Sequence, residues 1–161
     1  MNVKTGLVLV LIGLGIVLPF WAFADDTPAD NMQLVVEKIR ADKKLFVGAN
    51  MGLTEQEAKG FWPVYETYQD ELFLLRARTL RLINDYAQAY ENMTDSKAKD
   101  LLDELITIDT LGLKLRQVYL PKFREVLSNV KVVRYYQIEN KIHAALFYEL
   151  AAKIPLIQEA K

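Results

Sequence analysis

The fold is decided by residues 53–91, LTEQEAKGFWPVYETYQDELFLLRARTLRLINDYAQAYE. Thr54 followed by Glu57 is the pattern of a capping box, which begins a helix. Beyond it, one stripe of side chains recurs at alternating steps of four and three residues. Its members are Phe61, Tyr65, Tyr68, Leu72, Leu75, Thr79, Leu82, Tyr86 and Ala89, of which only Thr79 is polar. A stripe with this spacing needs a partner helix to cover it, so the segment predicts one arm of a helical pair.

The second arm follows Asn92-Met93-Thr94, the expected tip, with Thr94 as its capping residue. The same spacing continues through Ala98, Leu101, Leu105, Ile108, Gly112, Leu115 and Tyr119. Two helices joined by so short a turn are expected to lie antiparallel, with the numbers of facing residues adding up to about 186. This pairing predicts opposite charges across the hairpin: Arg81 beside Asp103 and Glu104, Arg76 and Arg78 near Asp109, Asp70 and Glu71 near Lys114 and Arg116, and Glu66 near Lys122.

Pro63 and Pro121 fall at about the same height on the two arms. A proline inside a helix removes a backbone hydrogen bond and bends or breaks the helix. The hairpin is therefore predicted to be curved near its open end.

Two shorter amphipathic segments flank the hairpin. The first runs from Met32 to about Phe46, and residues 47–52 are expected to break it. The last runs from about Asn129 to Lys153 and has apolar residues along two stripes, so we expect it to be buried between two surfaces. One surface is its own hairpin, and the other is the first helix or a second subunit. The prediction is an all-α domain of four helices over residues 32–155, with a flexible arm at 25–31 and a tail at 156–161.

The N-terminus has the pattern of a secretory signal peptide over residues 1–24. Lys4 precedes an apolar run at 6–18, and Ala22-Phe23-Ala24 is a cleavage site of the A-x-A type. We expect export to the periplasm, cleavage after Ala24 and no stable membrane insertion afterwards. The alternative is an inner-membrane anchor formed by residues 6–23.

Composition argues against several functional classes. The formal net charge is −1, which is unlike the basic surface of a nucleic-acid-binding protein. There is no Cys and one His, and no nucleophile elbow or phosphate-binding glycine loop is present. The carboxylates alternate with Lys and Arg, as on a solvated helix surface. We expect no enzymatic activity, no cofactor and no metal site.

The exported helical pattern, the LTEQE helix start at 53–57, the Phe-Trp-Pro at 61–63 and the long hairpin together resemble the Spy/CpxP group of periplasmic proteins. That group is marked by an LTxxQ motif, and here Gln56 stands one position earlier. The resemblance covers roughly residues 35–150 and implies a curved four-helix hairpin that forms homodimers. Some members are ATP-independent chaperones, some repress an envelope stress pathway, some relatives sense metals, and none is an enzyme.

Two candidate sites follow from the sequence. The resemblance suggests that Arg76, Arg78 and Arg81 form a client-binding strip on the concave face. We prefer the interpretation that they pair with Asp103, Glu104 and Asp109 across the hairpin. His143 is interpreted as a half-buried side chain on an amphipathic seam, because Glu139 is the only fair metal ligand one turn away.

The resulting hypothesis is a periplasmic binding protein of chaperone type that holds partly unfolded envelope proteins on a curved amphipathic surface. A second hypothesis is a regulatory or sensory module that binds one envelope stress-response partner or a metal. A third is a structural envelope protein that keeps residues 6–18 as an anchor.

Overall fold

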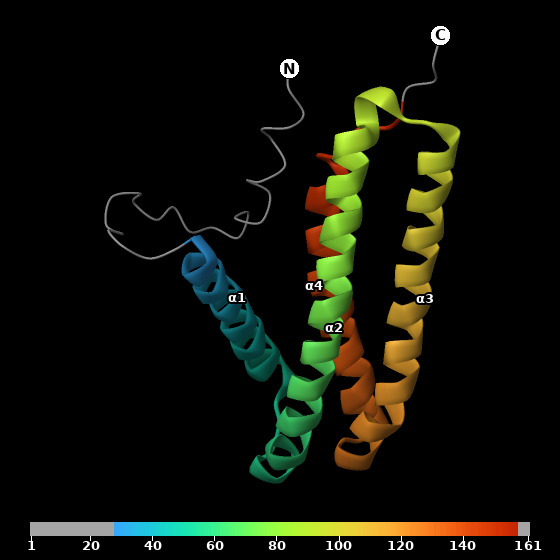
Figure 1. The fold of residues 1–161 in the computed structure, drawn as a ribbon. Coiled ribbons are helices and arrows are strands. Elements are labelled where there is room, and N and C mark those ends of the chain that lie inside the picture. The colour runs from blue at the N-terminus through green and yellow to red at the C-terminus, as the bar shows by residue number, and fades with distance from the viewer. Residues whose placement is uncertain (1–27, 158–161) are drawn as a thin grey trace.

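The computed structural model describes the backbone of residues 28–157 and the side chains of residues 37–157. Its elements are α1 (Pro28–Met51), α2 (Glu55–Ala89), the 3-10 turn η3 (Tyr90–Asn92), α3 (Asp95–Val126) and α4 (Asn129–Ala151). α2 and α3 form a long antiparallel hairpin closed by η3, and α1 and α4 flank it (Figure 1). The predicted all-α fold of four helices is confirmed. The predicted signal peptide, with Ala22 and Ala24, lies outside the described residues.

The helix starts are set by hydrogen bonds to side chains. Thr54 Oγ1 accepts from the Glu57 amide at 3.2 Å, and Glu57 Oε2 accepts from the Thr54 amide at 2.8 Å, which confirms the predicted capping box. Thr94 caps α3 as predicted, by accepting from the Lys97 amide. Ser128 caps α4 in the same way.

The predicted break at residues 47–52 is wrong, because α1 continues to Met51. Val47 and Met51 lie four residues apart on one face and are buried in the core. Their burial outweighs the low helix propensity of Gly48 and Asn50. The helix ends at Met51, and the next residue, Gly52, has a φ of 56°, a backbone conformation that favours glycine. At its other end α1 begins at Pro28, inside the segment expected to be an arm.

The core is a cluster of aromatic rings near the open end of the hairpin. Its fully buried large side chains are Phe61 and Tyr68 of α2, Tyr119 and Phe123 of α3, and Tyr135 of α4. The centroids of Phe123 and Tyr135 lie 4.7 Å apart, and those of Tyr68 and Tyr119 lie 5.2 Å apart. Towards the tip, the predicted α2 stripe is only partly buried. Most of the apolar burial is therefore concentrated at one end of the molecule.

The antiparallel pairing has the predicted register. A Cβ at Gly60 would lie 2.8 Å from Val126 Cγ1, and these residue numbers add up to 186. Arg78, predicted to lie near Asp109, instead donates twice to Glu104, at 2.9 and 2.7 Å. These two hydrogen bonds lower the pKa of Glu104, and Arg81 lowers it further, so both arginines lie near that carboxylate.

Other predicted charge pairs are replaced by contacts with α1. Glu66 pairs with Lys44, and Asp70 pairs with Arg40. Lys122, the predicted partner of Glu66, lies over the Tyr119 ring at 4.1 Å. The cations of α1 have displaced those expected from α3.

Neither proline breaks its helix. α2 runs through Pro63 and α3 runs through Pro121, each as one continuous helix (Figure 1). Both prolines are exposed, so the carbonyl group that each leaves without a helical donor can be hydrated. The curvature of the hairpin stays a prediction.

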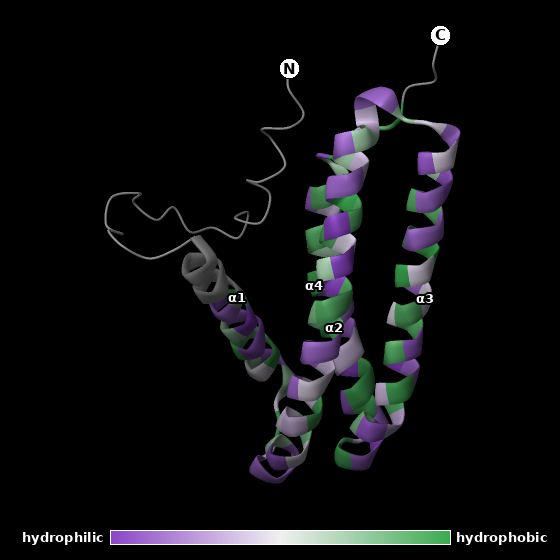
Figure 2. Ribbon diagram, viewed as in Figure 1, coloured by the Kyte–Doolittle hydropathy of each residue, from purple (hydrophilic) through white to green (hydrophobic). Residues whose placement is uncertain are grey.

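The expectation that α4 is buried on two sides is wrong for the described residues. One face is buried, through Val132, Tyr135, Ile138 and Glu139. The second stripe is not covered, since Val133 is 57% exposed and Phe147 is 45% exposed. Figure 2 shows hydrophobic residues along both α3 and α4 well beyond the open end.

Candidate binding surface

The three arginines predicted as a client-binding strip lie on different sides of α2. Positions 76 and 78 are about 200° apart around a helix with 3.6 residues per turn. Arg78 pairs with Glu104 of α3, whereas Arg76 contributes to lowering the pKa of Lys43 in α1 and of His143 in α4. Arg81 is exposed and donates to the backbone oxygen of Ala77 at 3.4 Å.

His143, interpreted from the sequence as half-buried, is exposed in the structure, and its ring stacks on Phe147 with the centroids 4.0 Å apart. Partial burial lowers the pKa of His143, and Arg116 and Arg76 lower it further, while Asp109 and Glu139 act in the opposite direction. Its electrostatic neighbours therefore include residues of α2 and α3. Among the described residues, no group of three His, Cys, Asp or Glu side chains is placed to hold a metal ion.

A buried polar network joins three helices. Lys43 Nζ of α1 donates to Glu139 Oε2 of α4 at 2.8 Å and to Gln69 Oε1 of α2 at 2.7 Å. Gln69 Nε2 in turn donates to Glu139 Oε1 at 3.0 Å and lies 3.2 Å from the Tyr135 hydroxyl. The side chains of Lys43 and Glu139 are only 9% and 6% exposed.

This network is suited to holding the helices together. Burial lowers the pKa of Lys43 to about 8, although Glu139 acts in the opposite direction. Within the described residues, every buried side-chain nitrogen and oxygen has a hydrogen-bond partner. Both charged groups are enclosed, so a substrate in solution has little access to them. Sequence reasoning missed this network because its members lie on three separate helices.

The largest exposed apolar feature of α3 is a second stripe beside the hairpin seam. Leu102, Ile106 and Leu113 are 57%, 58% and 59% exposed. Their spacing of four and seven residues places them on one face of the helix. Further along α3, the same face includes Leu120 and Arg124, and there it lies beside α4.

The exposed stripe of α4 lies on the side towards α3. Tyr136 donates to the backbone oxygen of Arg116 at 3.2 Å, which joins the two helices near the open end. One turn later, Asn140 lines a hollow together with residues of α3. The pKa of His143 is lowered by Arg116 and raised by Asp109, both of which belong to α3. We call the exposed apolar side chains on this side of the molecule the α3–α4 face. They are Leu102, Ile106, Leu113, Val133 and Phe147.

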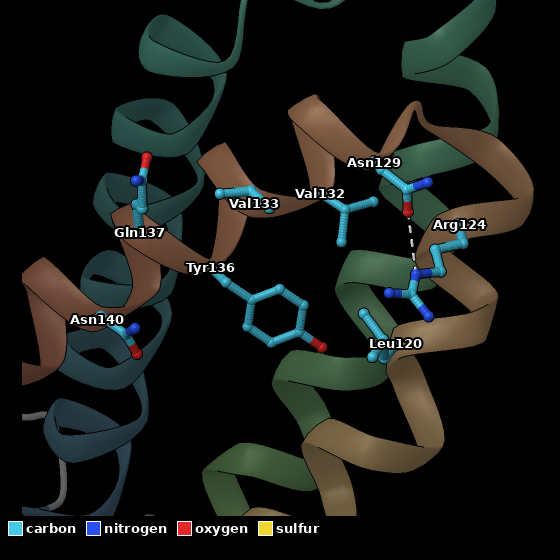
Figure 3. A pocket seen from close by; sticks show the side chains of 8 residues that line it. All are labelled: Leu120, Arg124, Asn129, Val132, Val133, Tyr136, Gln137 and Asn140. Atoms are coloured by element: carbon cyan, nitrogen blue, oxygen red, sulfur yellow. Dashed lines mark hydrogen bonds between the residues drawn. The ribbon is translucent and has the colours of Figure 1, made fainter.

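A surface hollow of about 550 Å³ lies between α3 and α4 near the short connection that joins them, at the open end of the hairpin (Figure 3). Its apolar lining consists of Leu120, Val132, Val133 and the ring of Tyr136, which extends from α4 towards α3. Its polar lining consists of Arg124, Asn129, Gln137 and Asn140. Arg124 Nε donates to Asn129 Oδ1 at 3.1 Å.

Sequence reasoning did not single out this face. The pattern search selected the seam that includes Leu101 and Leu105, and it left Leu102, Ile106 and Leu113 unassigned. Their spacing was a usable signal, but only the position of α4 shows that the stripe is uncovered.

Comparison with known proteins gives no match to a family model, a curated protein or a solved structure. Within residues 28–157, no helix is both long enough and apolar enough to cross a membrane. The fold and the surface thus define a class: a four-helix protein with a core at one end and an exposed apolar face along α3 and α4.

Proposed function

We propose that this chain is an exported, non-enzymatic protein that binds partly unfolded envelope proteins through the α3–α4 face, as a chaperone without an energy source. Export rests on the signal-peptide pattern of residues 1–24. The observation that supports binding is the row of Leu102, Ile106 and Leu113, each more than half exposed on one face of α3.

Single exposed apolar residues are ordinary in soluble proteins, but a contiguous apolar surface marks a site of interaction. The three α3 residues share one stripe, in which the exposed Asp109 stands between Ile106 and Leu113, and Val133 and Phe147 of α4 lie on the facing side. Apolar contacts are not directional, so such a surface can accept clients of differing sequence. The resemblance to the Spy/CpxP group supports the same function.

The test is suppression of aggregation by purified residues 25–161, the predicted mature chain. A chemically denatured protein is diluted into buffer without ATP, and light scattering is followed over a range of molar ratios. We expect suppression near stoichiometric amounts. The triple variant Leu102→Gln, Ile106→Gln, Leu113→Gln should lose most of it.

A matched control replaces three apolar residues located elsewhere, each of which is also more than half exposed. Leu45, Leu74 and Val118 are 71%, 65% and 55% exposed. Their triple Gln variant should suppress aggregation as well as the parent chain. Equal loss in both triple variants would contradict the assignment to the α3–α4 face.

The alternative function is regulation of one envelope stress-response partner. A folded chain that fails to suppress aggregation, yet retains a single saturable partner in a pull-down from envelope extract, would favour it. Formation of a homodimer stays a prediction, and light scattering coupled to size-exclusion chromatography measures it directly.

A further inference from the structure

We propose that the hollow between α3 and α4 is a subsite for the free C-terminus of an apolar polypeptide. The terminal carboxylate binds Arg124, and the last apolar side chain lies on the lining formed by Leu120 and Val133. This inference rests on the proposed function and gives it a defined partner chemistry.

The first observation is the charge of the hollow. Arg40, Lys43, Lys44, Arg78 and Lys131 each pair with a carboxylate within the chain. Among the described residues, Arg124 has no carboxylate partner, as is also true of Arg81 and Arg134, but only Arg124 lines the hollow, where its Nε is hydrogen-bonded to the neutral side chain of Asn129. The terminal amino groups of its guanidinium are therefore available to a carboxylate of another molecule.

A second cation adds to the positive character of the hollow. Burial raises the pKa of the Tyr136 hydroxyl. Arg116 lowers that pKa, the Glu139 carboxylate raises it, and Arg124 lowers it to a smaller extent. Two guanidinium groups and one carboxylate therefore act on a side chain that lines the hollow, and the carboxylate of Glu139 is not part of the lining. The lining contains no acidic residue, so the site is complementary to an anion.

The second observation is that apolar and cationic groups adjoin each other. Leu120 and Arg124 lie one helical turn apart on α3, and the ring of Tyr136 extends towards them from α4 (Figure 3), while Val133 of α4 also lines the hollow. The volume of about 550 Å³ lies within the range of small-ligand sites.

The C-terminus of a chain fits this arrangement better than an internal acidic residue. A C-terminal residue has its carboxylate and its side chain on the same Cα. In an extended internal segment, neighbouring side chains point to opposite faces, so an acidic group and the next apolar group point apart. Capture of a terminal carboxylate is also a known mode of peptide recognition.

The test is fluorescence anisotropy with the protein expressed from its full sequence. The probe is a fluorescein-labelled peptide that ends in alanine, valine and leucine with a free carboxylate. Its partner probe is the same peptide with a C-terminal amide, and a third probe places aspartate before the three apolar residues of the amide. We expect the free carboxylate to bind about tenfold more tightly than either amide, as expected for one hydrogen-bonded ion pair.

The decisive variant is Arg124→Gln, which should bind all three probes equally. Lys141→Gln removes an exposed cation outside the hollow on α4 and should keep the preference. Thermal melting verifies that both variants are folded. Val133→Asp, which adds a carboxylate to the lining, should weaken binding of the free acid more than binding of the amide.

Equal binding of the three probes by the parent chain, absence of binding, or a preference that survives in Arg124→Gln would each overturn the proposal. Aggregation suppression separates this failure from failure of the proposed function. Suppression without a carboxylate preference retains the function and removes the subsite. A carboxylate preference without suppression retains the subsite and removes the chaperone function.

Discussion

Lys43 and Glu139 form an ion pair in a place where neither charge has much access to water. The loss of hydration opposes such a pair. The pair contributes to stability only if hydrogen bonds satisfy its remaining donors and acceptors. Gln69 supplies them here, with one contact to each partner. The pair therefore specifies how α1, α2 and α4 meet.

The prediction at this scale concerns an uncompensated charge. Lys43→Met leaves Glu139 buried without its cation and should lower the free energy of unfolding by roughly 3 kcal/mol. The double variant Lys43→Met, Glu139→Leu should recover most of that loss, because no buried charge remains. Urea denaturation of the parent chain and of each variant measures the effect. A double variant as unstable as the single one would show that the pair itself stabilises the fold.

At the scale of the helix, α2 and α3 approach each other closely where Gly60 meets Val126. A Cβ at position 60 would lie 2.8 Å from Cγ1 and 3.0 Å from Cβ of the valine. At these distances the valine side chain or one of the two helices would have to shift. Glycine costs helix propensity of about 1 kcal/mol relative to alanine. The close approach of the two arms explains why glycine is suited to this position.

Gly60→Ala should therefore destabilise the protein by roughly 1–3 kcal/mol despite its better helix propensity. In a Val126→Ala background, the same substitution should cost much less, because the nearest atom has been removed. Thermal or urea unfolding of the four members of the cycle measures the coupling. Additive effects would argue that the two residues are not in contact.

Across the whole molecule, the packed core and the proposed binding surface occupy different regions. The aromatic core lies near the open end, and the stripe of Leu102, Ile106 and Leu113 runs towards the tip. At the tip, the hydroxyls of Tyr86 and Tyr90 donate to the backbone oxygens of Pro155 and Leu156. Few buried apolar groups support this region, which favours local opening.

Hydrogen exchange should reveal this division. Amides of residues 61–68 and 115–123 should exchange slowly, through global unfolding, and those of residues 80–105 should exchange faster, through local opening. Mass spectrometry of peptic fragments over a time course measures both regions. Uniform protection along the hairpin would contradict the unequal stability of its two ends.

Short-range chemistry accounts for what the sequence determined by itself. The capping box at Thr54, the second cap at Thr94, the helical stripes and the antiparallel pairing all depend on residues a few positions apart or on one short turn. Hydrogen bonds and apolar periodicity at that range are readable from a single chain. The boundaries of α1 were less readable, because burial of Val47 and Met51 overrides local propensity.

The tertiary structure decided which charges pair and which apolar stripe stays exposed. Lys43 meets Glu139 across 96 positions of sequence, and Arg40 and Lys44 take the carboxylates that the hairpin pattern assigned to α3. Near the open end, α4 packs against α3 through Tyr135 and Tyr136, whereas nearer the tip Leu102, Ile106 and Leu113 stay exposed. These outcomes depend on how α1 and α4 lie against the hairpin, which is set by the summed packing of distant residues and by no local pattern.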